Sequence, residues 1–142
     1  MKGYRISCDA KDMQLSAVHA FISKTYWAKD IPIETMALAI KNSLCFGVFT
    51  ETGEQVAFAR MITDRATFAY LADVYVDQQH RSKGLSKWLM SAIMQHPDLQ
   101  NIRRMVLATS DAHGLYEQFG FKALANANIF MEIHDANVYS KA

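Results

Sequence analysis

Apolar residues recur along this chain at two spacings, and each spacing predicts a kind of element. Alternation of apolar and polar residues predicts strands at 4–8, 44–50, 55–62 and 68–76. A short, wholly apolar run predicts a strand buried on both faces at 105–109. Recurrence at every third or fourth residue predicts helices at 12–24, 32–42, 84–96 and 112–119. Two further apolar runs, 121–124 and 129–133, predict the last strands.

Residues typical of turns and helix ends separate these elements. Asp12 and Asp111 are suited to begin helices as N-caps, and Gly120 is suited to end one. The segment 51–54 contains a glycine and predicts a hairpin between its flanking strands. A helix between the strands at 68–76 and 105–109 predicts a crossover, so these two strands run parallel. The predicted fold class is mixed α/β: one domain, 1–142, with a twisted, mostly antiparallel sheet and helices on both faces.

The connection after the strand at 68–76 carries the most informative motif, Arg81-x-x-Gly84-x-Ser86. A helical pattern begins directly after it. The first amides of a helix have no partner within the helix, and the helix dipole adds positive character there. A glycine lets a phosphate approach the backbone closely. The motif therefore predicts a diphosphate site, although an ordinary strand-to-helix connection with solvated Arg81 and Lys83 would have the same form.

A second block supports the first and makes the combination specific. Residues 112–121 read Ala-His-Gly-Leu-Tyr-Glu-Gln-Phe-Gly-Phe, with Tyr116 at their centre. The two blocks, in this order and about one helix and one strand apart, resemble the acyl-CoA signature of the GNAT superfamily of N-acetyltransferases. Ser86 departs from the Gly or Ala usual at its position. The resemblance implies a GNAT-like sheet in which the parallel pair of strands splays apart, and acetyl-CoA as cosubstrate.

The resemblance also assigns residues to the cosubstrate. Backbone groups of the strand end would bind the pantetheine arm, and the amide of Val76 or its neighbour would polarise the thioester carbonyl. The turn amides would bind phosphate, and Thr109, where relatives carry Asn, would contact the arm. The implied cofactor-binding residues are Val74, Tyr75, Val76, Arg81, Ser82, Lys83, Gly84, Leu85, Ser86 and Thr109.

Tyr116 and Asp73 are the candidate catalytic residues. A phenol is protonated at neutral pH and can donate to a departing thiolate, which suits Tyr116 to the general acid; without the motif it would be interpreted as a core aromatic. Asp73 is the one carboxylate within the strand 68–76, where it alternates with Leu71 and Tyr75. It could act as the base, bind a cationic acceptor or cap a loop amide. Family members often use a water chain in place of one base.

The acceptor is an amine whose identity the sequence leaves open. The resemblance places its site between the loop 26–30, the helix that begins near Ile33 and the segment 125–130. There Tyr26 and Trp27 could stack on an acceptor or pack the loop onto the sheet. A non-catalytic CoA-binding sensor is the alternative function, although the retained Tyr116 argues against it. A nucleotide-binding α/β domain is disfavoured because Gly-x-Gly-x-x-Gly is missing.

Composition and charge limit the classes of partner that we expect. Fifteen basic and fourteen acidic residues give a net charge of +1, which favours neither nucleic acid nor a membrane surface as partner. We expect no metal, because the five histidines are scattered. We expect buried free thiols at Cys8 and Cys45. The amino-terminal residues include no apolar signal region, so we expect a cytoplasmic protein. The resemblance leaves open a homodimer formed through the last strands.

Overall fold

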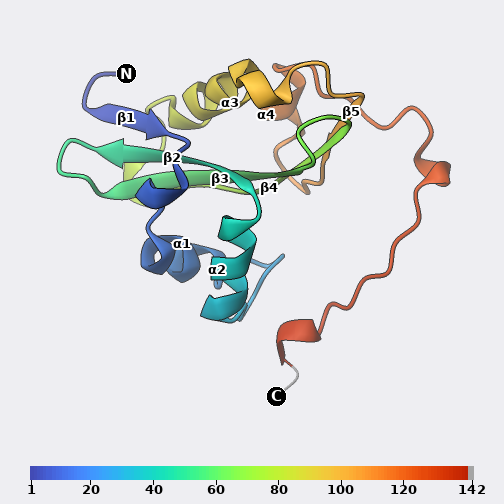
Figure 1. Cartoon of the computed structure of the whole chain (residues 1–142), viewed down its shortest axis with the longest axis horizontal. Helices are drawn as coiled ribbons and strands as arrows, with labels where there is room; N and C mark the ends of the chain where they lie inside the picture. The colour runs from blue at the N-terminus through green and yellow to red at the C-terminus, as the bar shows by residue number, and fades with distance from the viewer. Residues whose placement is uncertain (141–142) are drawn as a thin grey trace.

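The computed structural model describes residues 1–140 as a five-stranded sheet with helices on both faces (Figure 1). This confirms the predicted fold class. The strands are β1 (Tyr4–Ser7), β2 (Leu44–Thr50), β3 (Gln55–Thr63), β4 (Phe68–Val76) and β5 (Arg104–Leu107). The helices are α1 (Leu15–Ile22), α2 (Ile33–Lys41), α3 (Leu85–Gln95) and α4 (His113–Glu117). Of these helices, none is long and apolar enough to cross a membrane.

The strands follow one another across the sheet in chain order, β1-β2-β3-β4-β5. The first four are antiparallel, and β4 and β5 are parallel, as the crossover through α3 requires. Figure 1 shows α3 and α4 above the sheet and α1 and α2 below it. Each helix pair buries its apolar face, which gives two core clusters: one under α3 and α4, the other under α1 and α2.

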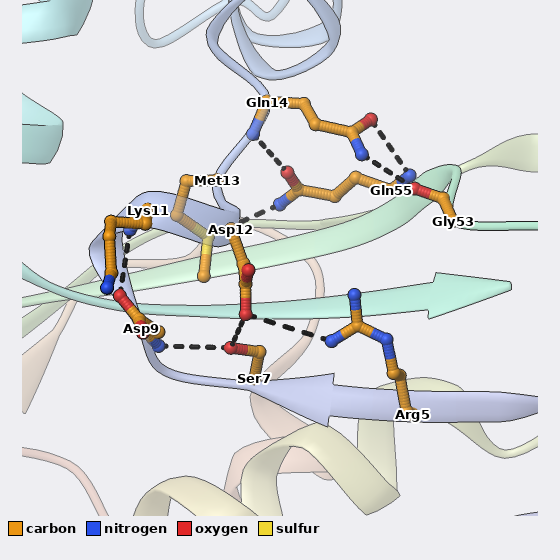
Figure 2. A network of polar contacts seen from close by, with 9 residues as sticks. All are labelled: Arg5, Ser7, Asp9, Lys11, Asp12, Met13, Gln14, Gly53 and Gln55. Atoms are coloured by element: carbon orange, nitrogen blue, oxygen red, sulfur yellow. Dashed lines mark hydrogen bonds and ion pairs between the residues drawn. The ribbon is translucent and has the colours of Figure 1, made fainter.

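A glutamine pair joins the start of α1 to the start of β3 (Figure 2). The backbone N–H of Gln14 donates to Oε1 of Gln55 at 2.8 Å, and the backbone N–H of Gln55 donates to Oε1 of Gln14 at 3.1 Å. Nε2 of Gln14 also donates to the carbonyl of Gly53 at 2.6 Å. Gln55 is buried, and these bonds satisfy groups that would otherwise be costly to bury. The pair therefore fixes where α1 begins against the sheet.

Strand β4 contains a β-bulge at Asp73. Arg60 of β3 pairs with Ala72 and Phe58 pairs with Tyr75, so two residues of β4 lie opposite one residue of β3. Asp73 has a φ of 56°, in the left-handed region that aspartate tolerates better than most residues. The bulge changes which face each side chain points to: Leu71 lies in the cluster under α3, whereas Tyr75 lies in the cluster under α1 and α2.

That change of face corrects the sequence interpretation of β4. Asp73 was expected to share one face with Leu71 and Tyr75, and those two side chains in fact pack on opposite faces. The extra residue of the bulge turns every later side chain of β4 to the face opposite to the one that simple alternation predicts. Both faces of β4 are covered by core, so residues on either face are apolar and the sequence does not reveal the shift.

The structure also corrects several helix ends. Asp12 does not begin α1: it ends a 3₁₀ turn (Ala10–Asp12) and accepts a hydrogen bond from Ser7 at 2.6 Å, and α1 starts at Leu15. Asp111 is not the N-cap of α4. Pro32 precedes α2 as its N-cap. Both cysteines are free, and Cys45 is buried as expected, but Cys8 is exposed because it lies just beyond the end of β1.

The two predicted last strands are not formed. Within residues 121–140 the structure has 3₁₀ turns at Ala127–Ile129 and Val138–Ser140 and otherwise irregular chain. In Figure 1 this segment, orange to red, leaves the sheet as an extended arm. We call residues 122–140 the C-terminal arm. A strand needs a neighbour for its backbone groups, and the arm runs without one among the described residues.

Candidate functional site

The candidate site lies where β4 and β5 separate. The two strands pair from Phe68 with Arg104 up to Leu71 with Leu107, and β4 then continues to Val76 without β5 beside it. A cavity of about 480 Å³ opens at this point and reaches toward the loop between α1 and α2. Its lining includes residues 70–74 and 107–109, together with Tyr116. We call it the splay cavity. The sequence-predicted splayed pair is thus present.

The turn between β4 and α3 presents free backbone amides. Ser82 has a φ of 65° and Gly84 a φ of 81°, and left-handed residues of this kind turn successive amides toward one concavity. The first amide bonded within the helix is that of Trp88, which donates to the carbonyl of Gly84 at 3.1 Å. Within residues 1–140, none of the amides from Ser82 to Lys87 donates to another group of the chain. The turn is therefore suited to an anion with several oxygens.

Side chains of the turn fall into two groups. Arg81, Ser82 and Lys83 are exposed, and Ser86 is partly exposed. Leu85 is buried in the cluster under α3, so its backbone amide, and not its side chain, is available to a ligand. The Arg81 Nε donates to the carbonyl of Val76 at 3.1 Å, which ties the turn to the end of β4. Positive charge is thereby held beside the free amides.

The backbone of β4 also turns polar groups toward the splay. The Asp77 amide donates to the carbonyl of Val56 on β3 at 2.8 Å. Because backbone groups alternate along a strand, those of Val76 and Val74 point to the other side, away from β3. Tyr75 is placed differently: its ring stacks on Phe21 at 3.9 Å in the lower cluster. Burial raises the pKa of Tyr75, so it stays neutral at physiological pH.

Tyr116 is held at the edge of the splay cavity by α4. Its side chain is 8% exposed, packs edge-on against Phe121 and lines the cavity. Burial is the main cause that raises the pKa of Tyr116, and the charge of Asp111 adds to it. The phenol is therefore a proton donor over the whole neutral range. Among the described residues its hydroxyl has no hydrogen-bond partner within the chain, so it is available to a ligand.

Thr109 lies at the end of β5, on the wall of the same cavity. Its Oγ1 accepts hydrogen bonds from the amides of Ala112 at 3.1 Å and Asp111 at 3.4 Å. These bonds close a turn just before α4, whose N-cap residue Ala112 makes no side-chain capping bond. The hydroxyl proton of Thr109 is still able to donate toward the cavity.

Asp73 is tied to two side chains on the far wall of the cavity. Its Oδ2 accepts from Arg60 Nε at 2.6 Å, and its Oδ1 accepts from Trp27 Nε1 at 2.8 Å. Arg60 in turn donates from Nη1 to Ser43 at 3.2 Å. Sequence reasoning missed Arg60. A cation within the apolar run 55–62 was the available signal, because such a charge needs a buried partner.

The loop that carries Tyr26 and Trp27, between α1 and α2, lines the splay cavity. Tyr26 and Trp27 contact each other edge to face at 5.0 Å. The Tyr26 hydroxyl is hydrogen-bonded to Ser110 at 2.9 Å, which links this loop to the end of β5. The arm adds Glu132, His134 and Tyr139 to the cavity lining. Within residues 1–140 no group of three or more metal-ligating side chains comes together.

The comparisons with known proteins agree with this geometry. Residues 41–123 match the family model described as the acetyltransferase (GNAT) domain. A protein of Gibberella zeae assigned as an acetyltransferase is 31% identical over 133 residues, which cover 80% of this chain and 75% of that protein. A crystal structure of a Xanthomonas campestris protein assigned to the GNAT family is 50% identical, with a TM-score of 0.95 over 99% of both chains. A Clostridium acetobutylicum structure determined with acetyl-CoA has a TM-score of 0.62 at 16% identity over 92% of this chain and 94% of that one, and shows the fold.

Proposed function

This chain belongs to the GNAT family of acetyltransferases, and on that premise we propose that it moves an acetyl group from acetyl-CoA to a primary amine by direct attack. The observation that carries the proposal is the continuity of three features: the free amides of the turn 82–87, the open end of β4, and the phenol of Tyr116. We expect them to bind, in this order, the diphosphate, the pantetheine arm and the reacting end of a thioester ligand.

The residues present fit acetyl-CoA. The amides from Ser82 to Ser86 and the side chains of Arg81 and Lys83 would hold the diphosphate. The backbone of Val74 and Val76 would bind the pantetheine arm as a neighbouring strand would. Thr109 would donate to the same arm from the opposite wall. Acetyl-CoA would supply an activated acetyl group, and the Val76 amide would polarise its carbonyl.

Tyr116 would complete the reaction as general acid. The amine nitrogen forms a bond to the carbonyl carbon, the carbon–sulfur bond breaks, and the sulfur leaves as a thiolate that takes the phenolic proton. The amine loses its own proton to water in the cavity. Asp73 is a less suitable base than the sequence indicated, because both of its oxygens already accept hydrogen bonds. We assign it to positioning Arg60 and Trp27 on the acceptor side.

Binding of acetyl-CoA and of CoA, measured by calorimetry, tests the first part. Gly84→Glu places a carboxylate in the turn, and we expect affinity to fall on the order of a hundredfold or more through repulsion of the diphosphate. The substitution also forces a non-glycine residue to a φ of 81°, which costs about 1 kcal/mol. Gly53→Glu is the matched control, because Gly53 has a φ of 91°, open space around it and a place in the β2–β3 turn.

The control separates charge at the turn from strain in the backbone. Equal loss of affinity in both variants, or none in Gly84→Glu, would contradict the turn as the diphosphate site. A panel of amines, with release of free CoA thiol as the readout, then tests transfer. Binding without transfer to any amine would favour the CoA-binding sensor over the enzyme.

A further inference from the structure

Two carboxylates line the splay cavity without a partner in the described chain. Asp111 follows β5, and Glu132 lies on the C-terminal arm. Within residues 1–140 neither side chain makes a hydrogen bond or an ion pair. The third acid of the lining, Asp73, is already paired with Arg60. Two negative charges are therefore left at the cavity, and they would repel an anionic acceptor and attract a cationic one.

Positive charge in the lining does not balance these carboxylates. Arg60 donates to Asp73 at 2.6 Å, so its charge is already compensated. His134 is the remaining basic side chain among the described lining residues, and the two unpaired carboxylates outnumber it. Burial is the larger cause of the raised pKa of Tyr116, and the charge of Asp111 adds to it. The negative potential therefore extends from the mouth of the cavity to its phenol.

Two aromatic rings are fixed at the same cavity. Tyr26 and Trp27 are 71% and 47% exposed. The Tyr26 hydroxyl is nevertheless hydrogen-bonded to Ser110 at 2.9 Å, and the Trp27 indole donates to Asp73 at 2.8 Å. Because the polar end of each ring is bonded to the chain, what remains for a ligand is the ring face. Such faces attract an ammonium group.

The phenol of Tyr116 indicates which end of the cavity takes the reacting nitrogen. The residue is 8% exposed, and within residues 1–140 its hydroxyl has no hydrogen-bond partner. A polar group that is buried to this extent is normally paired, so a ligand is expected there. One open volume of about 480 Å³ is lined by this phenol, by the two rings and by both free carboxylates. A small unbranched molecule can therefore reach both ends.

We propose that the acceptor is a small unbranched diamine, whose second ammonium group lies between the free carboxylates and the two rings. The inference rests on the proposed acetyl transfer and names its acceptor. The reacting nitrogen loses one proton to water and bonds to the carbonyl carbon while the carbon–sulfur bond breaks. Tyr116 gives its proton to the departing thiolate and takes the second proton of that nitrogen. The other nitrogen keeps its proton and its charge throughout.

Three amines with the same chain of four carbons test the proposal. Putrescine ends in an ammonium group, butylamine in a methyl group and γ-aminobutyrate in a carboxylate. At saturating acetyl-CoA, kcat/KM for putrescine should exceed that for butylamine on the order of thirtyfold after correction for its two equivalent amines, because each exposed charge or ring contact contributes a few-fold. The value for γ-aminobutyrate should fall below that for butylamine. Equal values for putrescine and butylamine would overturn the diamine proposal and leave acetyl transfer established.

Charge-removing variants locate the second ammonium group. Asp111→Asn and Glu132→Gln each remove one carboxylate charge with little change in size. The ratio of kcat/KM for putrescine to that for butylamine should fall about threefold to fivefold in each, and on the order of tenfold or more in the double variant. Glu132→Asp should keep most of the ratio. Glu117→Gln is the matched control, because Glu117 is an exposed acid of α4 outside the lining of the splay cavity, and its ratio should be unchanged.

Two results with these variants would contradict the site. An equal fall of the ratio in Glu117→Gln would mean that the overall charge of the protein, and not the cavity, attracts the diamine. An unchanged ratio in the double variant would mean that these carboxylates do not bind it. Faster transfer to a lysine-containing peptide than to putrescine would also overturn the proposal, because the acceptor would then be a protein.

Calorimetry separates this inference from the proposed function. If none of the three amines is acetylated, the proposed transfer fails, but putrescine and butylamine can still be titrated into protein saturated with CoA. Putrescine should bind on the order of tenfold more tightly than butylamine and lose that advantage in the double variant. This result would support the diamine site by itself. Equal affinity for the two amines, or binding of neither, would overturn it.

Discussion

Removing the carboxylate of Asp73 should destabilise the fold more than most single substitutions do. Asp73 is the partner of Arg60 at 2.6 Å, and the side chains of the pair are 5% and 16% exposed. Asp73→Ala leaves the guanidinium in place without its counter-charge and the Trp27 indole without its acceptor. It also puts a non-glycine residue without a polar side chain at a φ of 56°.

The magnitude follows from these three losses. Breaking a buried ion pair by removing one partner costs about 3–5 kcal/mol. The bond from Arg60 to Ser43 remains, which favours the lower end of that range. The lost indole bond adds about 1 kcal/mol, and the left-handed backbone adds about 1 kcal/mol. We expect Asp73→Ala to lower the free energy of unfolding by about 5 kcal/mol.

Asp73→Asn is the informative companion. Asparagine tolerates the left-handed backbone and still accepts from Trp27, so it removes little beyond the charge. We expect it to cost about 2 kcal/mol, and the double variant Asp73→Asn with Arg60→Met to recover part of that loss. Urea unfolding followed by tryptophan fluorescence measures all three, since Trp27 lies at the pair. Acetyl-CoA affinity should change less than threefold, because we propose that the pair serves the acceptor and not the diphosphate turn.

The reasoning would be refuted by an Asp73→Asn variant whose unfolding free energy lies within about 0.5 kcal/mol of the wild type, the range of ordinary surface changes. If that variant were equally stable but inactive in acetyl transfer, Asp73 would be the base that the sequence first indicated. A stable protein with altered acceptor preference would instead place the role of Asp73 in binding, with Arg60 unaffected by its loss.

Two other side chains give sharp expectations. Tyr116→Phe should lower kcat about a hundredfold. Acetyl-CoA affinity and stability should stay nearly unchanged, because the hydroxyl makes no hydrogen bond within residues 1–140. An unchanged kcat would mean that water, and not Tyr116, gives the departing thiolate its proton. Burial raises the pKa of Cys45 from 9.0 to about 11, so its contribution to stability is present below pH 9 and is lost as pH rises through 11. The loss should be about 2 kcal/mol, and Cys45→Ala should remove that part of the alkaline slope in urea titrations at pH 8 to 11. An unaltered slope would mean that burial does not raise the pKa of Cys45 in the folded chain.

Most of the fold was predictable because its signals are local. Strand β4 was predicted with its observed ends, Phe68 and Val76, since an alternating run is bounded by polar turns on both sides. The turn at Gly84 was predicted because a polar segment with a glycine separates an alternating run from a helical pattern, and this glycine has a φ of 81°. In both cases a few neighbouring residues determine the backbone.

What failed depends on distant residues. The pattern at 129–133 predicts a strand, but a strand also needs a neighbouring edge to pair with, and among residues 1–140 none pairs with this segment. Asp12 was predicted to cap a helix from its neighbours in sequence alone. Its actual hydrogen-bond partner, Ser7, lies on β1 and could not be read from those neighbours. The partner of Asp73 was hidden for the same reason: Arg60 is on the neighbouring strand, and the bulge that brings the two together leaves no mark in the alternation.

The bulge also means that one residue determines which face of the sheet each side chain in the second half of β4 points to. Without the extra position at 73, β4 would continue its pairing with β3 in constant phase, and its second half would present the opposite side chains to each layer. A deletion there, unlike a deletion in a surface loop, would exchange the inner and outer faces of Val74, Tyr75 and Val76 together. The number of residues in β4 is therefore constrained as tightly as their type. We expect homologues with the same separation of β4 and β5 to differ at these positions by substitution rather than by insertion or deletion.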